Sequence, residues 1–548
     1  MILAYVGSAR AASTLAELRG GSNAQAAVAR SYDGGDSALV LTCPPSTTLA
    51  DGARLGHAPL PFAELRVGEH APTLAITRSG FGGRPMYLRA VADGVLASTD
   101  LGWMVSASRA LDLPVTLDAD ALAARCAHLP AADQRSIYAE IAELPPGTRA
   151  AVTRNGWSLT RLSPPRPAAE DASAAELLGV LVRAVASAAG AAPDRIGVLT
   201  GGGLDSGALL AVARRLDYEV NAFAIDFAGR DSDRPYLAEL CRAHDLVPCR
   251  VSVGDEEFAL GDDAAGLPLT WPSGALEATL LARARVWGAS IVLSGAFADA
   301  CLDGDAEAAS HVILRSGVSR AIGVGRAYDE ASLAVGVRRA FYPHVRRLLP
   351  APLRRAVRAI RRRTDRPSVR AFDGPRLRAA REDAWTRARE LPPATEDRAA
   401  ARLADAFFSR ELGLLAELRA QEEALAGVLR VDPYLAEELV TFALSLRPDV
   451  LVTNGRRRGL FRDAVSGILP YALIARAGKA SFRPLHAALI ARDAGRDRDR
   501  FHALDALGVV DGAAANAALS IARRRGSEHD GELLSLLGVE SWLSGRDT

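Results

Sequence analysis

The sequence predicts an α/β protein in three successive parts: a β-rich front part, a parallel sheet with helices on both faces, and a mostly helical C-terminal part. Three patterns indicate this architecture. Residues 1–165 alternate short apolar runs with turns. From residue 174, strand and helix patterns alternate, which is typical of a parallel sheet. From about residue 305 to the end, the pattern is mostly helical.

Short apolar runs mark six strands expected in the front part: 4–6, 38–41, 73–76, 86–89, 96–98 and 149–152. Prolines at positions 164, 165 and 167 then predict a linker, because proline interrupts regular structure. We therefore expect a front domain at residues 1–165 and a second domain at residues 174–548.

The second domain begins with a helical pattern and then four predicted strands, at 196–199, 220–227, 248–253 and 290–293. Helical patterns lie between these strands, including one at 207–215. In parallel sheets of this kind, ligands bind beyond the carboxyl ends of the strands. Two of the predicted strands run into glycine-containing turns, so we expect a binding site at those two strand ends.

The first of these turns reads Leu199-Thr200-Gly201-Gly202-Gly203-Leu204-Asp205-Ser206. Consecutive glycines let backbone N–H groups approach an anion, because no Cβ stands in the way. The helix that follows adds the positive end of its dipole. Ser206 can donate to a phosphate oxygen, whereas Asp205 suits a magnesium ion. The alternative is a glycine-rich turn that only packs the strand on the helix.

The second turn, Ser294-Gly295-Ala296-Phe297-Ala298-Asp299, follows the strand at 290–293. Asp299 is a candidate second magnesium ligand. Two carboxylates and a set of phosphate oxygens make a suitable site, because Mg²⁺ takes few protein ligands and keeps water. The alternative is an aspartate at a strand end that caps the next helix.

The first turn resembles the SGGxDS pyrophosphate loop of ATP-pyrophosphatases that adenylate carboxylates, with Gly201 in place of the first serine. The second turn resembles the S-G-x-G-x-D turn of the asparagine synthetase superfamily. The resemblance implies an ATP-pyrophosphatase-type sheet that binds ATP and Mg²⁺. It places ATP at Leu199, Gly201, Gly202, Gly203, Asp205, Ser206 and Gly295, and Mg²⁺ at Asp205 and Asp299.

Residues 476–482, Arg-Ala-Gly-Lys-Ala-Ser-Phe, resemble the R-x-x-K-x-x-F segment of the same superfamily. The resemblance implies catalytic roles for Arg476 and Lys479, and Lys479 would stabilise the negative charge on the α-phosphate and the departing pyrophosphate. Lys479 is the only lysine in the chain. The alternative is a surface lysine at a helix end. A neighbouring motif of the superfamily, here at 456–462, carries Arg458 where lysine is usual.

Residues 80–87 and 144–147 resemble the F-G-x-R-P-L-Y-Y and L-P-P-G motifs of the superfamily. The resemblance implies a β-rich sandwich of the Ntn type, similar to a glutaminase, at residues 1–165. Such a glutaminase uses a cysteine as its first residue and nucleophile. Ile2 stands at this position, and the first cysteine is Cys43. We therefore expect a degenerate glutaminase-like domain, so that the amine must come from the substrate.

The motifs also depart from two reactions of the superfamily. Ala296 stands where asparagine synthetases carry a glutamate and where β-lactam synthetases carry a tyrosine. Among members without the cysteine, the chain most resembles the lasso peptide cyclases, whose C-terminal segment carries a Trp-Leu pair like Trp542-Leu543. This resemblance implies that ATP adenylates an Asp or Glu side chain of a peptide. The N-terminal amine of the peptide then closes a macrolactam, and AMP and pyrophosphate are released.

The lasso cyclase interpretation implies a peptide substrate, with a leader-binding protein and a leader peptidase as candidate partners. Two alternatives stay open. One is an amide-forming enzyme that acts on a small molecule, as asparagine and β-lactam synthetases do. The other is a non-catalytic scaffold that retains the fold.

Composition excludes several other classes. Lys and Arg total 66 and Asp and Glu total 65, so the net charge of 66 − 65 = +1 gives no reason to expect nucleic acid. Five scattered cysteines lack the spacing of a disulfide framework or a zinc site. No apolar stretch reaches about 18 residues, so no membrane span is expected. The cytoplasm, where ATP and reduced thiols are found, is the expected location.

One charged segment has no assigned role. Residues 337–370 contain twelve arginines and a single acid, Asp365. A solvated, irregular helix pair is the favoured interpretation, and a docking surface for an acidic peptide or partner protein is the alternative.

Overall fold

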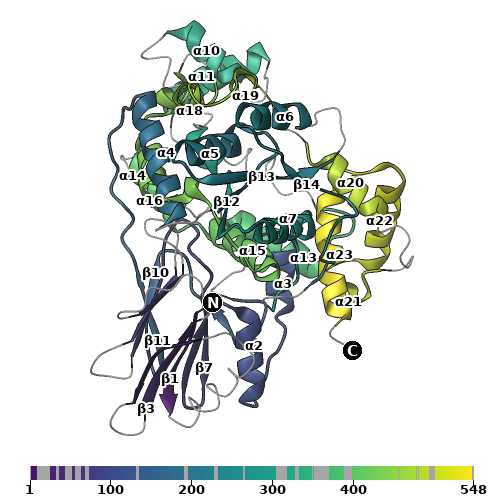
Figure 1. Ribbon diagram of the computed structural model, residues 1–548. Coiled ribbons are helices and arrows are strands. Elements are labelled where there is room, and N and C mark those ends of the chain that lie inside the picture. Colours follow the sequence, from purple (N-terminus) through teal and green to yellow (C-terminus); the bar gives the residue numbers. More distant parts are fainter. Residues whose placement is uncertain are drawn as a thin grey trace.

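The computed structural model shows a mixed α/β protein, with two antiparallel sheets in the lower part of Figure 1 and a parallel sheet above them. Helices surround the parallel sheet and form the C-terminal part, as the sequence predicts. The structure describes residues 2–8, 25–31, 36–42, 52–55, 63–67, 73–130, 135–190, 195–227, 233–262, 266–303, 317–327, 332–348, 350, 369–387, 398–453, 456–476, 478, 481–492 and 500–545.

The two antiparallel sheets have six strands in the order β2-β3-β1-β8-β7-β9 and five in the order β11-β10-β6-β5-β4. Apolar side chains from both sheets, among them Val6, Val95, Ile76 and Val152, form one buried cluster. The strands are β1 (Ile2–Ser8), β2 (Gln25–Ser31), β3 (Asp36–Thr42), β4 (Gly52–Leu55), β5 (Ala63–Val67), β6 (Leu74–Arg78), β7 (Tyr87–Val91), β8 (Gly94–Ser98), β9 (Ala142–Glu143), β10 (Thr148–Thr153) and β11 (Gly156–Arg161).

The six strands predicted for the front part are confirmed as β1, β3, β6, β7, β8 and β10. The prediction missed β2, β4, β5, β9 and β11. Four of these five lie at sheet edges. An edge strand buries fewer side chains and can carry more polar residues, so its apolar pattern is weak. β11 illustrates this, because none of its residues is fully buried.

The segment between β11 and the next helix, residues 162–173, has neither helix nor strand, as predicted for the proline-rich linker. α4 (Ala174–Ala189) then begins with a capping box. The Ser173 side chain accepts from the Glu176 N–H, and the Glu176 carboxylate accepts from the Ser173 N–H. The box satisfies two backbone donors and fixes where the helix begins.

The parallel sheet has the strand order β14-β13-β12-β15-β16. Its strands are β12 (Arg195–Leu199), β13 (Glu219–Asp226), β14 (Cys249–Ser252), β15 (Ile291–Ser294) and β16 (Leu429–Val431), and its helices are α5 (Leu204–Arg215), α6 (Arg234–Ala243), α7 (Gly274–Trp287) and α8 (Ala298–Leu302). The four predicted strands are confirmed, and their parallel pairing with them. β16 was not predicted, since three residues are too few for a pattern.

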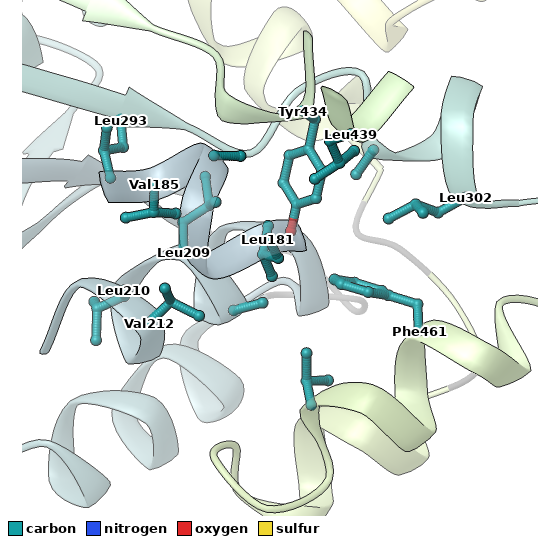
Figure 2. Packing of buried hydrophobic residues seen from close by; sticks show 14 of the residues in the cluster. Leu181, Val185, Leu209, Leu210, Val212, Leu293, Leu302, Tyr434, Leu439 and Phe461 are labelled. Atoms are coloured by element: carbon teal, nitrogen blue, oxygen red, sulfur yellow. The ribbon is translucent and has the colours of Figure 1, made fainter. Parts of the chain in front are cut away.

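Both faces of the parallel sheet are covered, as parallel sheets require. α4 and α5 pack on the face formed by Ile196, Val198 and Leu293. Figure 2 shows this cluster, with the ring of Tyr434 among side chains of α4, α5 and α16. α7 packs on the opposite face, where Phe223 and Val292 lie.

The remaining helices confirm the prediction of a mostly helical C-terminal part. They are α10 (Val318–Ala327), α11 (Leu333–Leu348), α13 (Pro375–Arg387), α14 (Arg398–Phe407), α15 (Arg410–Ala426), η2 (Pro433–Leu435), α16 (Glu437–Ser445), α17 (Pro448–Leu451), α18 (Gly459–Val465), α19 (Tyr471–Ala475), α20 (Arg483–Arg492), α21 (His502–Ala506), α22 (Gly512–Arg525) and α23 (Asp530–Ser544). In the described part of the chain, no helix has the length and apolarity needed to cross a membrane.

The helix α15 joins the front part to the rest of the molecule through buried ion pairs. Its Glu417 contacts Arg125 and accepts a hydrogen bond from the Tyr87 hydroxyl at 2.6 Å. Six residues further along the same helix, Glu423 contacts Arg84. Removing one partner of such a buried pair is costly, so these contacts hold the two parts in a defined arrangement.

The front part also contains α2 (Leu101–Ala110) and α3 (Ala119–Cys126), and His128 follows α3. The His128 ring contacts Ser535 of the C-terminal helix α23. Its Nε2 lies 3.2 Å from the Thr270 carbonyl oxygen and 3.3 Å from the Ser535 hydroxyl. Burial lowers the pKa of His128, although the contact with Thr270 opposes this shift. The folded protein therefore holds a neutral imidazole here.

We expect His128 to make the protein less stable in mild acid. An unfolded histidine has a pKa of about 6.5, so its stabilising contribution is complete above that pH and is lost as the pH falls through the lower pKa of the folded state. The control is His128→Asn, because asparagine tolerates the positive φ of 52° at this position. The melting temperature of the wild type should fall toward that of the variant between about pH 7.5 and about pH 5. A constant difference contradicts the assignment.

Candidate active site

The candidate site lies at the carboxyl edge of the parallel sheet, where β12 and β15 end side by side with Leu199 opposite Ser294. The glycine turn after β12 is held by Thr200, whose hydroxyl oxygen accepts from the Gly202 N–H at 3.1 Å and from the Ser206 hydroxyl at 2.9 Å. Gly202 has φ +93°, and a Cβ there would lie 2.3 Å from the Leu237 nitrogen. Only glycine fits this position.

The helix α5 begins at Leu204, three residues before the predicted start at 207. Asp205 and Ser206 therefore belong to its first turn. Gly203 is the N-cap residue, and no side chain caps the helix. A cap without a side chain leaves the first backbone N–H groups available to an anion.

The second turn packs directly against this helix end. A Cβ at Gly295 would lie 2.6 Å from the Ser206 nitrogen, so glycine is required for close packing. The sequence predicted Gly295 as a nucleotide contact. The structure gives it a packing role as well, which brings Asp299 in α8 toward Asp205 in α5.

Asp205 and Asp299 both contact one guanidinium, that of Arg458. Its Nη1 donates to Asp205 Oδ1 at 2.5 Å, and its Nη2 contacts Asp299 Oδ1. Its Nε donates to Asp303 Oδ1 at 3.1 Å. In the sequence, Arg458 stands out only as a replacement for lysine, with no predicted role. The structure places it between the two aspartates predicted to bind magnesium.

This geometry fits the predicted magnesium site. Two carboxylates that converge on one cationic group can also converge on a metal ion, and their oxygens are the donors that Mg²⁺ prefers. No group of three or more His, Cys, Asp and Glu side chains with metal-binding geometry occurs among the residues that the structure describes. Asp205 and Asp299 would therefore need phosphate oxygens and water to complete the coordination.

Further arginines give the residues around the site a modest excess of positive charge. Arg456 and Arg462 both donate to the carbonyl oxygen of Ile474, which leaves their charges without a carboxylate in these contacts. Burial lowers the pKa of Arg462, and the charges of Arg456 and Arg458 lower it further. Neighbouring arginines that repel one another in this way favour the binding of a ligand with several negative charges.

Of the two predicted catalytic residues, Arg476 and Lys479, the structure describes the first. Arg476 lies at the site, where its Nη2 is 2.5 Å from Asp233 Oδ1 and its guanidinium lies 4.2 Å from the centre of the Tyr236 ring. Asp233 also faces Gly201, because a Cβ there would lie 2.8 Å from its Oδ2. Lys479 lies outside the described residues, so its role stays a prediction.

These groups line a cavity of about 1010 Å³. One wall is apolar and includes Phe227 and Phe482, whose ring centres are 5.6 Å apart. The predicted residues that line it are Leu199, Gly201, Gly203, Asp205, Ser206, Gly295, Asp299 and Arg476. Gly202 does not line the cavity but shapes the turn. The apolar wall was not predicted, because the segments that form it are distant from one another in the chain.

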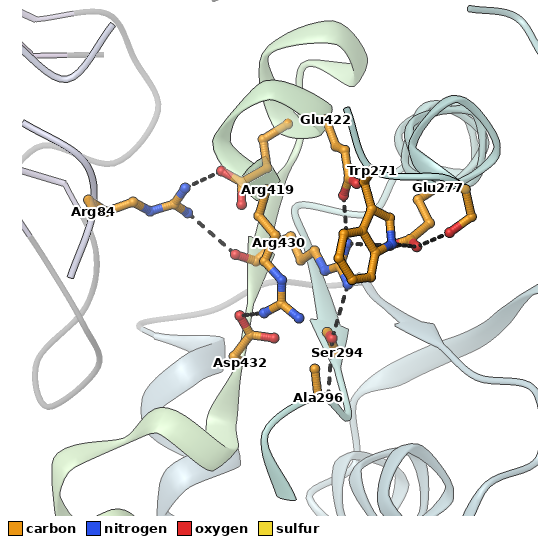
Figure 3. A network of polar contacts seen from close by, with 11 residues as sticks. Arg84, Trp271, Glu277, Ser294, Ala296, Arg419, Glu422, Arg430 and Asp432 are labelled. Carbon is orange, nitrogen blue, oxygen red and sulfur yellow. Dashed lines mark hydrogen bonds and ion pairs between the residues drawn. The ribbon is translucent and has the colours of Figure 1, made fainter. Parts of the chain in front are cut away.

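A buried polar network supports the second turn (Figure 3). The Arg430 side chain donates to Glu277 at 2.8 Å, to Glu422 at 2.7 Å and to the Ser294 hydroxyl at 3.4 Å. Ser294 in turn accepts from the Ala296 N–H at 3.3 Å. Glu277 also accepts from Trp271 Nε1 at 3.1 Å. The network therefore fixes the turn that leads to Asp299.

A glycine turn at the carboxyl end of a parallel strand, with a pair of acids and several arginines beside it, is typical of nucleotide-binding proteins of the α/β class. The profile of the asparagine synthase family matches residues 176–544. The chain therefore belongs to this family, whose enzymes use ATP to form amide bonds. A comparison with curated protein sequences gave no match.

Proposed function

We propose that this protein is an ATP-dependent, AMP-forming ligase that closes a macrolactam in a peptide, as lasso peptide cyclases do. The observation that carries the proposal is the cavity at the carboxyl edge of β12 and β15. At about 1010 Å³ it reaches the upper end of small-molecule pockets, which leaves room for a nucleotide together with a peptide segment. Its lining combines the glycine turn, two acids and an apolar wall.

In this proposal the residues have distinct tasks. The backbone of Gly201–Gly203 and the Ser206 hydroxyl bind the pyrophosphate part of ATP, and the apolar wall with Phe227 receives the base. Asp205 and Asp299 hold Mg²⁺, which neutralises phosphate charge when bound. Lys479 and Arg476 stabilise the charge that develops as the substrate carboxylate attacks the α-phosphate and pyrophosphate leaves.

The second half of the reaction needs the peptide amine close to the acyl adenylate. The amine nitrogen forms the new C–N bond, the C–O bond to AMP breaks, and the amine releases a proton. Holding both ends of one peptide together supplies much of the rate. Ala296 offers neither a phenol nor a carboxylate at the position where β-lactam and asparagine synthetases carry one, which disfavours those two reactions.

The setting of the reaction follows from the same proposal. The substrate is a peptide freed from its leader, and a leader-binding protein and a leader peptidase are the proposed partners. Nucleic acid is not a proposed partner, and the proposed location is the cytoplasm. A small-molecule ligase of the same family is the second candidate, because the nucleotide part of the site would serve both reactions equally.

The deciding experiment incubates the protein with ATP, Mg²⁺ and leader-free candidate peptides. We expect AMP and pyrophosphate to form only with a cognate peptide, which loses one water by mass spectrometry. Release of ADP excludes the proposal. Loss of water from a free amino acid, with no peptide present, supports the small-molecule alternative. Nucleotide binding without turnover for any substrate supports a scaffold.

Lys479 gives a sharper test of the chemistry. Lys479→Met should lower the rate of AMP formation by about 100-fold, because one preorganised charge at the transition state is lost. Binding of a non-hydrolysable ATP analogue should change much less. Lys479→Arg is the matched control that keeps the charge. Equal rates for the wild type and Lys479→Met would mean that this lysine is a surface residue.

A further inference from the structure

The Arg458 guanidinium occupies the point at which two acids from separate elements converge. Asp205 comes from the first turn of α5 and Asp299 from α8, and Arg458 immediately precedes α18. Nη1 of Arg458 donates a hydrogen bond to Oδ1 of Asp205, and Nη2 contacts Oδ1 of Asp299. The side chain of Arg458 is only 6% exposed, so this contact is internal to the site.

The backbone holds Arg458 in this place. Its φ is +58°, in the left-handed region that a non-glycine residue adopts at an energetic cost. The next residue is tightly enclosed, because a Cβ at Gly459 would lie 2.0 Å from the Thr453 carbonyl oxygen. The chain therefore has little freedom to carry Arg458 away, and a change of partner must come from rotation of its long side chain.

We propose that Arg458 is a built-in counter-cation that occupies the divalent-cation site and competes with the metal for Asp205 and Asp299. This inference rests on the proposed function, which assigns both acids to magnesium. A singly charged guanidinium and a divalent ion repel each other at contact distance, so both cannot hold the same two carboxylates. Metal binding and the Arg458 contacts exclude each other.

The competition makes the metal depend on the nucleotide. Two carboxylates supply only part of the coordination that Mg²⁺ requires, and displacing a charged, hydrogen-bonded guanidinium costs free energy. Bound phosphate removes both obstacles. Its oxygens complete the coordination of the metal, and they offer new hydrogen-bond acceptors to the displaced Arg458. Metal and nucleotide therefore bind cooperatively, and the coupling is reciprocal.

The test measures Mn²⁺ binding by electron paramagnetic resonance of the free ion, without any turnover. In the absence of nucleotide, Arg458→Met should bind Mn²⁺ about tenfold more tightly than the wild type, because the competing cation is gone. Adding α,β-methylene-ATP should then tighten Mn²⁺ binding strongly in the wild type and much less in Arg458→Met. This loss of coupling is the signature of direct competition.

The matched control is Arg457→Met, which removes the same charge from the neighbouring position. Arg457 contacts Asp303 in the site, whereas Arg458 contacts Asp205 and Asp299. We expect the Mn²⁺ affinity of Arg457→Met to stay within about twofold of that of the wild type. The charge of a half-exposed arginine is screened by solvent and salt, so its removal changes the potential at the metal site only weakly. An equal gain in both variants would reduce the effect to net charge and overturn the proposal.

Melting curves establish that each variant is folded. If Arg458→Met does not fold, Arg458→Lys takes its place with a smaller expected gain of about threefold, because an ammonium lacks the fork that spans both acids. Mn²⁺ binding that neither substitution changes overturns only the role of Arg458. Absence of Mn²⁺ binding from every protein with the analogue bound overturns the magnesium assignment itself, and the competition with it.

Discussion

Gly202→Ala should reduce AMP formation by about a thousand-fold or to below detection, because it distorts the turn that positions every phosphate contact. The φ of +93° at this position is unfavourable for alanine, and the new Cβ would lie 2.3 Å from the Leu237 nitrogen and 2.6 Å from the Tyr236 carbonyl carbon. These are backbone atoms of α6, which cannot rotate away as a side chain can. Binding of α,β-methylene-ATP by calorimetry and the melting temperature should both fall.

Gly203→Ala is the neighbouring control. Gly203 has φ −73°, and the nearest atom to an added Cβ is the Ser206 hydroxyl oxygen at 3.7 Å. Alanine fits here without strain, so the melting temperature should fall much less than in Gly202→Ala, by no more than the weaker N-cap preference of alanine. Because Gly203 lines the cavity, nucleotide binding should still weaken. If Gly202→Ala keeps wild-type activity, the turn is not the phosphate site.

Arg430→Met should destabilise the folded protein by about 3–5 kcal/mol, because it leaves two buried carboxylates without their cation. Glu277 and Glu422 both form ion pairs with the Arg430 guanidinium, and their side chains are only 16% and 2% exposed. Burial already raises the pKa of Glu422 well above its ordinary value, and the charge of Glu277 raises it further. The midpoint of urea unfolding, followed by tryptophan fluorescence, measures the loss.

The pH dependence of this variant distinguishes its cause. Without Arg430, both carboxyl groups should have pKa values above that of an unfolded glutamate, about 4.3. The folded state then binds more protons than the unfolded state, so the variant regains stability as the pH falls toward about 5. Glu277→Gln and Glu422→Gln, added to Arg430→Met, should restore part of the loss at neutral pH. A loss that is independent of pH would indicate a packing defect instead.

Much of the fold follows from local patterns in the sequence. Strands β12 and β15 are buried on both faces and form continuous apolar runs, so they were recognised at once. The prediction was wrong at the start of α5, because Asp205 and Ser206 were assigned to the turn and they belong to the helix. The N-cap of α5 is a glycine, which gives no polar signal for a helix start. The N-cap of α4 is Ser173, a residue type that predicts a helix start.

The candidate site was only partly accessible to sequence reasoning. The glycine turn and Asp299 each follow a strand end, and parallel strands bring such ends to one edge of a sheet, so their proximity could be predicted. The side chains that contact Asp205 could not be predicted from the sequence. Arg458 is separated from it by more than two hundred residues, and no local periodicity reports on a contact of that kind.

The sequence by itself determined the α/β class of fold and the glycine turn between a strand and a helix, because each depends on residues that are adjacent in the chain. Only the tertiary structure decided which charges meet. It placed Arg458 between Asp205 and Asp299, and Arg430 between Glu277 and Glu422. The physical reason is that a charge takes its partner from whatever folding brings within a few ångströms, and burial then decides how much that partner matters.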